Sequence, residues 1–217
     1  MGKKLIRLFF ILILALVGVL VIIVMIVNQP VPNGTMGQDA EALADEMLAT
    51  LNKEAFDSLE YIEFSFREKH EYRWDLANNT VWVKWEEDEV YLNLNKIAGA
   101  FDERETEAYE YFINDSFWLV APFKIRDDGV IRSTVEVENG RGLLVTYSSG
   151  GLTPGDSYLW IIDEKGFPKS WRLWTSNIPV GGLELSWSGW VNTDQVWFST
   201  LHESKIATIP VTVHSTR

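Results

Sequence analysis

The chain begins with a continuous apolar run and only later changes to alternating patterns. Residues 8–27 read LFFILILALVGVLVIIVMIV, 20 positions without a charge. At about 1.5 Å rise per residue, this run would extend roughly 30 Å as a helix, which is the hydrocarbon thickness of a bilayer. The run continues into Asn28-Gln29-Pro30 without the small residues of a signal-peptide cleavage site, so it predicts an uncleaved membrane-spanning helix. A long signal sequence that is cut in the following residues is the alternative.

The charges beside this run predict its orientation. Lys3, Lys4 and Arg7 precede it, and no Lys or Arg follows before Lys53. The positive-inside rule therefore places the N-terminus in the cytoplasm and the remainder of the chain in the periplasm or another extracytoplasmic space. We expect a single-pass membrane protein with an N-terminal membrane anchor and cytoplasmic tip (1–27), a Pro- and Gly-containing linker (28–37) and one folded domain (38–217).

Two segments of the domain have a helical pattern. In residues 38–51 the apolar positions recur at i, i+3 and i+4, which is typical of an amphipathic helix, and Thr35 with Gln38 has the spacing of a capping box. A second helix is predicted over about 102–114. The run 117–123 after it is too apolar and aromatic for an exposed loop. We expect this run to form a plug or lid over the concave face of a sheet.

Most of the remaining chain alternates with a period of two, which is typical of half-buried strands. The richest stretch, 158–197, holds six of the ten tryptophans and is divided by turn residues into short apolar runs, as in a β-meander. Together these patterns predict an α+β fold: an incomplete antiparallel β-barrel of about ten or eleven strands, with helices that cover its concave face, preceded by one transmembrane helix.

Charge and cysteine content exclude several classes of function. The formal net charge is −12. Three of the 19 basic residues precede the apolar run, so the rest has 16 basic against 31 acidic residues, a balance of −15. Such a domain repels phosphate backbones, which argues against nucleic-acid binding. The chain has no cysteine, so disulfides, thiolate nucleophiles and cysteine acylation are excluded.

Candidate catalytic chemistry is sparse. The three histidines, His70, His202 and His214, include no closely spaced pair, so a histidine metal site requires all three to meet in space. The acids Asp115, Asp163 and 127–128 have no feature that separates a general base from a turn former. We therefore predict no catalytic residue, no metal site and no cofactor.

The large aromatic side chains carry the main functional signal. Each ring covers about 150–250 Å² of apolar surface, so ten tryptophans in one domain predict a ring-lined cavity as an alternative to an ordinary core. The candidate ligand-binding residues, chosen because they share a face of the alternating strands or lie in the plug, are Phe64, Phe66, Trp74, Trp85, Trp118, Trp160, Trp171 and Trp187.

Several short strings resemble one known group of proteins. They are YIEFSF at 61–66, NDSFWL at 114–119, YLWIID at 158–163 with GFP at 166–168, and WSGW at 187–190. In these strings and in the order of its elements, the chain resembles the LolA/LolB type of periplasmic lipoprotein carriers and receptors over about residues 38–205. The resemblance implies an incomplete antiparallel barrel that binds acyl chains on its concave side. The carriers of this group are soluble after their signal peptide is cleaved, whereas this chain is expected to keep its apolar segment. The receptors are acylated on a cysteine, and this chain has none. Both differences argue against a shuttle between membranes.

Three hypotheses of function follow. The first is a membrane-tethered extracytoplasmic binding module for a hydrophobic ligand: an acyl chain, a lipid or a lipidated protein in lipoprotein transport. The second is a non-enzymatic structural or interaction module of an envelope protein complex, in which the plug permanently fills the barrel and the acidic outer face meets a protein partner. The third is a hydrolase that uses Asp163 or Asp115 with His202. A filled interior favours the second hypothesis over the first.

Overall fold

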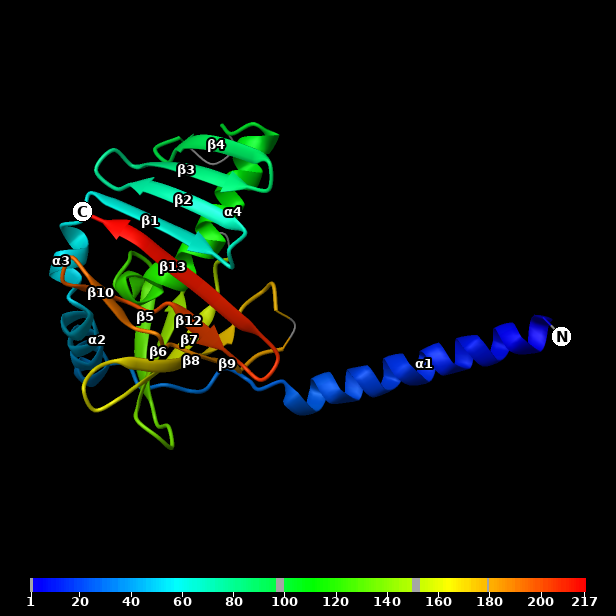
Figure 1. The fold of residues 1–217 in the computed structure, drawn as a ribbon. Helices are drawn as coiled ribbons and strands as arrows, with labels where there is room; N and C mark the ends of the chain where they lie inside the picture. The colour runs from blue at the N-terminus through cyan, green and yellow to red at the C-terminus, as the bar shows by residue number, and fades with distance from the viewer. Residues whose placement is uncertain (1, 97–99, 150–152, 179) are drawn as a thin grey trace.

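The chain is α+β with antiparallel sheets (Figure 1). The computed structural model describes residues 2–96, 100–149, 153–178 and 180–217, and in the first helix it describes the side chains of residues 6–19. The α-helices in this part of the chain are α1 (Gly2–Val27), α2 (Gln38–Leu51), α3 (Lys53–Asp57) and α4 (Glu103–Val120), and the 3-10 helix η1 (Ala121–Lys124) follows α4. Figure 1 shows α1 projecting away from the sheets and the other helices.

The larger sheet has six strands in the described residues. Their order is β12 (Leu201–Glu203), β13 (Thr208–Thr216), β1 (Tyr61–Phe66), β2 (His70–Asp75), β3 (Thr80–Trp85) and β4 (Asp88–Asn93). The pairing of β1 to β4 keeps one register, so side chains line up in rows across these strands. One set of rows, which includes Ile62, Phe64 and Tyr72, is buried and faces α4. The other set faces outward.

The second sheet has five strands within the described ranges. Their order is β5 (Val130–Val135), β6 (Arg141–Tyr147), β7 (Ser157–Ile162), β8 (Pro168–Trp174) and β9 (Leu183–Ser186), and β10 (Val191–Thr193) and β11 (Val196–Phe198) form a separate hairpin. Every residue of β7 is buried, so this central strand is covered on both faces. Tyr158, Trp160 and Ile162 face the main core.

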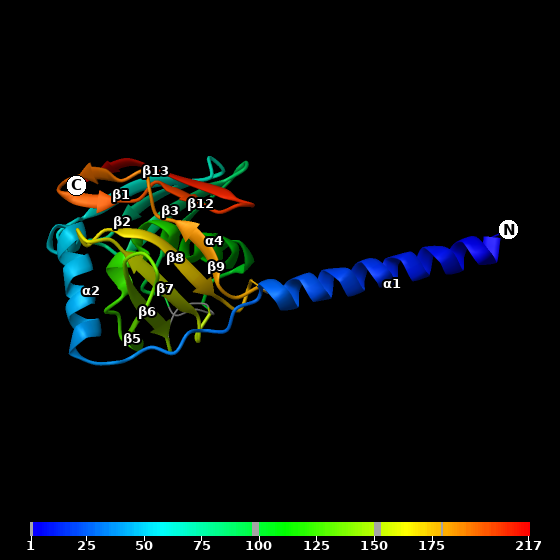
Figure 2. The same ribbon diagram turned by 90° about the horizontal axis from the view of Figure 1, so that it is seen from below.

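The helix α2 confirms the predicted amphipathic segment in its bounds and in its apolar stripe. Its buried residues are Ala40, Leu43, Ala44, Met47, Leu48 and Leu51. Figure 2 shows α2 beside the end of the five-stranded sheet, and Glu41 on its outer side forms ion pairs with Arg126 and Arg132. The predicted capping box is wrong, because Gly37 is the N-cap and Thr35 pairs instead with Thr134 of β5.

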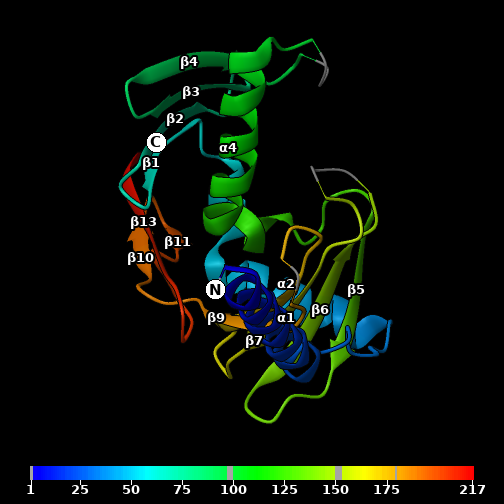
Figure 3. The same cartoon turned by 90° about the vertical axis from the view of Figure 1, so that its right-hand side faces the viewer.

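The helix α4 extends further than the sequence predicts. At its start, the Asp102 side chain accepts from the Glu105 backbone N–H and the Glu105 side chain accepts from the Asp102 backbone N–H, which is a capping box. The helix then runs to Val120, so the predicted plug is the last turn of α4 together with η1. Figure 3 shows α4 along the inner side of β1 to β4, with its C-terminal end directed toward the five-stranded sheet. One helix therefore contributes to both halves of the core.

Residues 28–35, predicted to be a linker, lie against the five-stranded sheet as a strap (Figure 2). At one side of the sheet, the indole N–H of Trp174 donates to the Gln29 carbonyl at 2.7 Å. At the other side, Thr35 and Thr134 exchange two backbone hydrogen bonds of 2.9 Å. Gly34 packs so closely that an added Cβ would lie 2.2 Å from Ser133 Oγ. The strap therefore occupies the edge of β5, which would otherwise be open for pairing.

The prediction of a membrane anchor is not upheld. Within the described residues, no helix is both long enough and apolar enough to cross a bilayer. The expectations of a transmembrane helix at 8–27, of a single-pass membrane protein and of a periplasmic domain are accordingly corrected. Lys3 and Lys4, which set the predicted orientation, lie outside the described side chains.

The prediction of one incomplete barrel is also wrong. The described strands number thirteen and form open sheets of six, five and two strands. In the described residues an isolated bridge, Ser188 to Leu201, and hydrogen bonds of Ser186 with His202 and Glu203 join the two larger sheets between β9 and β12. The chain turns away at Gly189, whose φ of +64° favours glycine, so β9 ends before a longer ladder with β12 can form.

Candidate functional site

Four of the eight candidate ligand-binding residues meet beneath the five-stranded sheet. Trp171 lies at the centre, with ring centroids 4.9 Å from Trp160, 5.0 Å from Trp187 and 5.2 Å from Trp118. His202 joins them, 4.4 Å from the ring of Trp187. We call Trp118, Trp160, Trp171, Trp187 and His202 the tryptophan cluster.

The local sequence explains why these rings converge. Trp160 and Trp171 are cross-strand partners on β7 and β8, and alternation directs both to the same face of the sheet. Trp187 follows directly after β9, and His202 comes from β12. Trp118 is contributed by the last turn of α4. The cluster therefore joins the two larger sheets and the predicted plug.

The other four candidates lie under the six-stranded sheet. Phe64 stacks on Tyr72 with centroids 4.6 Å apart, and Trp74 meets Phe112 of α4 edge to face at 5.0 Å. Trp85 contacts Tyr111 of α4, and Phe66 is buried at the end of β1. The sequence placed all eight on one concave surface; the structure divides them into two groups, one beside the middle of α4 at Tyr111 and Phe112 and one at its C-terminal end at Trp118.

The interior is occupied by these side chains themselves. Trp160 and Trp171 are 1% exposed and Trp187 is 2% exposed, while Trp74 and Trp118 are half-buried. Two clefts of about 430 and 250 Å³ lie elsewhere on the surface, the larger between the strap and Trp174 and the smaller over Arg172 and Glu184. None of the eight candidates lines either cleft.

Several polar atoms around the tryptophan cluster have no hydrogen-bond partner among the described residues. They are the indole N–H groups of Trp160, Trp171 and Trp187, the Tyr147 hydroxyl and His202 Nε2; Trp74, under the other sheet, has an unpaired N–H as well. A buried polar group without a partner costs about 1–3 kcal/mol. The nearly perpendicular rings place edges against faces, which offsets part of that cost.

His202 makes stability depend on pH. Its ring is fully buried, and this burial lowers its pKa from 6.5 to about 4, although Nδ1 lies 3.2 Å from the Ser186 carbonyl oxygen. Between these two pKa values the unfolded chain binds a proton at His202 that the folded chain does not bind. The contribution of the neutral ring to the free energy of unfolding is therefore complete above pH 6.5 and is lost as the pH falls toward 4.

We expect the free energy of unfolding to fall by about 1–1.5 kcal/mol between pH 7.5 and 5.5 because of this residue. Urea titrations of the native chain and of His202→Gln at both pH values measure it. An equal pH dependence in the two proteins would show that His202 takes up its proton in the folded state.

A second polar centre lies between α4 and β2, and sequence reasoning missed it. Asp115 is 2% exposed. One of its oxygens accepts from the Tyr72 hydroxyl at 2.6 Å and lies 2.6 Å from His70 Nδ1, and the other accepts from Asn114 Nδ2 at 2.9 Å. Burial and the Asp115 carboxylate raise the pKa of Tyr72. The only signal in the sequence was a single carboxylate inside the aromatic stretch 111–119.

The pairing of His202 with Asp115 or Asp163 that the hydrolase hypothesis requires is not among the contacts of the described residues. His202 packs against Trp118 and Trp187, and Asp115 pairs with His70 instead. Asp163 accepts from the backbone N–H groups of Lys165 and Phe167 in the β7–β8 turn at 2.8 and 2.9 Å. Over the part of the chain that is described, no group of three or more His, Asp or Glu side chains is placed to hold a metal ion.

No protein-family model matches the chain, and no curated protein matches it. The resemblance to lipoprotein carriers therefore stays a hypothesis based on the short strings.

Proposed function

We propose that the domain is a structural or interaction module whose aromatic interior is permanently filled. The observation that carries this proposal is the packing of the candidate ligand-binding side chains into two groups, each of which contacts α4. A binding site for a drug-sized apolar ligand needs a cavity of about 300–1,000 Å³ lined mainly by such rings. The two clefts of about 430 and 250 Å³ lie at the surface and are lined by other residues.

The contacts of α4 support this proposal. Leu119 and Val120 at its end are at most 2% exposed, and Phe123 of η1 is 2% exposed and stacks on Phe56 with centroids 4.1 Å apart. Removing a fully buried Leu, Val or Phe side chain from a core costs about 1.5–3 kcal/mol each. Displacement of α4 and η1 would also leave the Asp115 carboxylate without its partners on β2. Opening the interior therefore requires much of the free energy that holds the fold together.

A second candidate function is reversible burial of an acyl chain, a lipid or a lipidated protein, with the end of α4 moving aside. The unpaired polar atoms of the tryptophan cluster favour it, because a ligand with a carbonyl group would supply acceptors to the indole N–H groups. The half-buried Phe117 and Trp118 lie at the point where such an opening would begin.

Lipid analysis of the purified full chain separates the two candidates. We expect solvent extracts of the denatured protein to contain no stoichiometric lipid by mass spectrometry. We also expect tryptophan emission to stay unchanged when oleate or a lipidated peptide is titrated. A lipid present at about one per chain, or a saturable emission change, would contradict the filled interior and support reversible burial.

An engineered cavity provides the positive control. Trp160→Leu removes most of one ring from the centre of the tryptophan cluster, and apolar cavities of this kind bind small aromatic molecules. Indole should therefore raise the melting temperature of this variant and leave that of the native chain unchanged. The control shows that the assay detects an accessible interior when one exists.

A further inference from the structure

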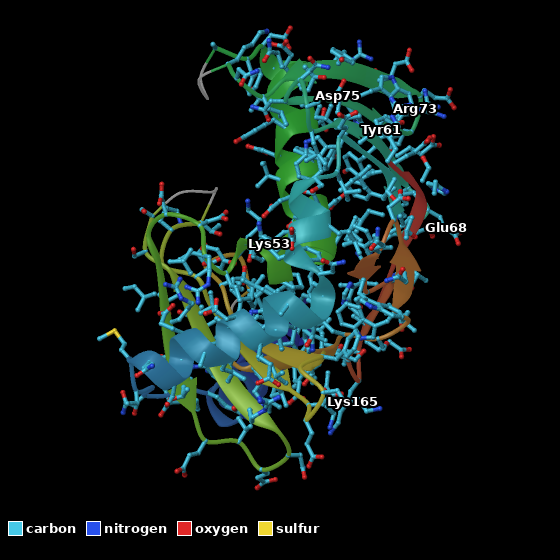
Figure 4. All side chains as sticks on the ribbon, turned by 90° about the vertical axis from the view of Figure 1, so that its left-hand side faces the viewer. Lys53, Tyr61, Glu68, Arg73, Asp75 and Lys165 are labelled. Atoms are coloured by element: carbon cyan, nitrogen blue, oxygen red, sulfur yellow. The ribbon has the colours of Figure 1, made fainter. Side chains whose placement is uncertain are left out.

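The outward face of β1 to β4 carries no covering helix or strand within the described residues. Figure 4 shows Tyr61, Arg73 and Asp75 on the side of the sheet away from α4. The register of the strands arranges this face in rows, and the residues of these rows are Tyr61, Asp75, Thr80 and Asn93, then Glu63, Arg73, Trp82 and Tyr91, then Ser65, Glu71, Lys84 and Glu89. We call these residues the outer face.

The side chains of the outer face are held in place before any partner arrives. The Arg73 guanidinium lies 4.4 Å from the Trp82 ring centroid, and its Nε donates to Glu63 at 3.2 Å. The hydroxyl of Tyr91, a residue 64% exposed, is hydrogen-bonded to Thr80 at 2.8 Å. Trp, Tyr and Arg are the residues that dominate binding energy at interfaces, and ordering them in advance lowers the entropy lost on association.

The order of residues along each row is self-complementary. A two-fold axis that runs along the strands between β2 and β3 places each row against its own reverse in a second copy. The opposed pairs are then Glu63 with the partner's Tyr91, Arg73 with the partner's Trp82, Glu71 with the partner's Lys84, Ser65 with the partner's Glu89, Asp75 with the partner's Thr80, and Tyr61 with the partner's Asn93. Every pair joins opposite charges, a cation with a ring, or groups able to form a hydrogen bond.

We propose that the outer face is the contact surface of a homodimer, formed face to face about this axis. The inference rests on the proposed interaction role and names its partner as a second copy of the chain. Because the same patch is used on both copies, each contact occurs twice and the assembly closes at two. The twelve residues of the outer face are fewer than the roughly 20–30 residues per side of a standard interface, so we expect the dimer to be weak and concentration-dependent.

Sedimentation equilibrium of the full chain tests the proposal, with a mild non-ionic detergent because Leu8 to Val19 of α1 expose apolar side chains. We expect a monomer–dimer equilibrium with Kd below about 1 mM. Arg73→Glu should raise this Kd at least about tenfold, since it removes two cation–ring contacts per dimer and adds negative charge to both opposed faces. The matched control is Arg104→Glu, which reverses an equally exposed charge on α4, and should change Kd less than about twofold.

Crosslinking gives a second readout that does not depend on folding of the charge variants. The chain has no cysteine, so Lys84→Cys introduces one thiol near the axis and Lys165→Cys one on the distant β7–β8 turn. A short bis-maleimide should crosslink the first variant into dimers and leave the second monomeric. Association that Arg73→Glu does not weaken, crosslinking equal at both positions, or a monomer up to about 1 mM would each overturn the homodimer. If no homodimer forms but the lipid analysis finds no bound lipid, the homodimer is ruled out and the proposal of a filled interior still stands.

Discussion

Trp171→Ala is expected to lower the free energy of unfolding by about 3–5 kcal/mol. The ring is 1% exposed and contacts the other three tryptophans of the cluster together with Tyr158 and Phe117. Its removal leaves a void in a region where close packing supplies the stability. Urea denaturation followed by far-ultraviolet circular dichroism measures the loss without relying on tryptophan emission.

Trp82→Ala is the matched control, because it deletes the same kind of ring from a half-buried position on the outer face. It should cost less than about 1.5 kcal/mol, chiefly through the lost contact with Arg73. Equal costs for the two substitutions would mean that the tryptophan cluster is loosely packed, which would favour the ligand-binding candidate.

Asp115→Ala is expected to cost about 3–5 kcal/mol. The substitution removes the acceptor shared by Tyr72 and His70 and leaves the Tyr72 hydroxyl buried without a partner. The tie between α4 and β2 would be lost with it. Chemical denaturation of the variant and of the native chain at pH 7.5 gives the difference directly.

Asp163→Ala serves for comparison, since this carboxylate accepts two backbone hydrogen bonds in a turn. Loss of such a local cap costs about 1 kcal/mol. If both substitutions lowered the free energy of unfolding equally, the Asp115 side chain would be accessible to solvent, and α4 would be less firmly attached than its contacts indicate.

Local patterns in the sequence determined most of the secondary structure. The stripe of 38–51 became α2 within the same bounds, because apolar spacing reports a helix face directly. Alternation at 62–66 and 81–85 became β1 and β3. The end of α4 was misplaced because aromatic residues at 117–123 fit a buried helix turn as well as a buried loop, and periodicity does not separate the two.

Long-range placement was harder to predict from one sequence. Alternation showed that Trp160 and Phe64 face inward, but it contains no information on which inward-facing rings meet, and the break between β9 and β12 divided them. The partner of Asp115 was equally hidden, since His70 is 45 residues away. The strap was missed because Pro and Gly in 28–37 are as typical of a docked segment as of a free linker.

The unpaired polar atoms connect the structural account to function. In a permanently filled core they are a fixed cost that close ring packing offsets. In a core that opens, the same atoms would be satisfied by a ligand. The two accounts therefore differ in how easily α4 leaves the tryptophan cluster, and this quantity is measurable in the ligand-free chain.

Native-state hydrogen exchange of the α4 amides tests the filled interior most directly. Amides that exchange only through global unfolding share one opening free energy, whereas a mobile segment opens at a lower one. We predict that the amides of Leu119 and Val120 have the same opening free energy as those of Leu159 and Ile161 in β7, to within about 0.5 kcal/mol. Opening of α4 at a free energy several kcal/mol below that of β7 would contradict a permanently filled core.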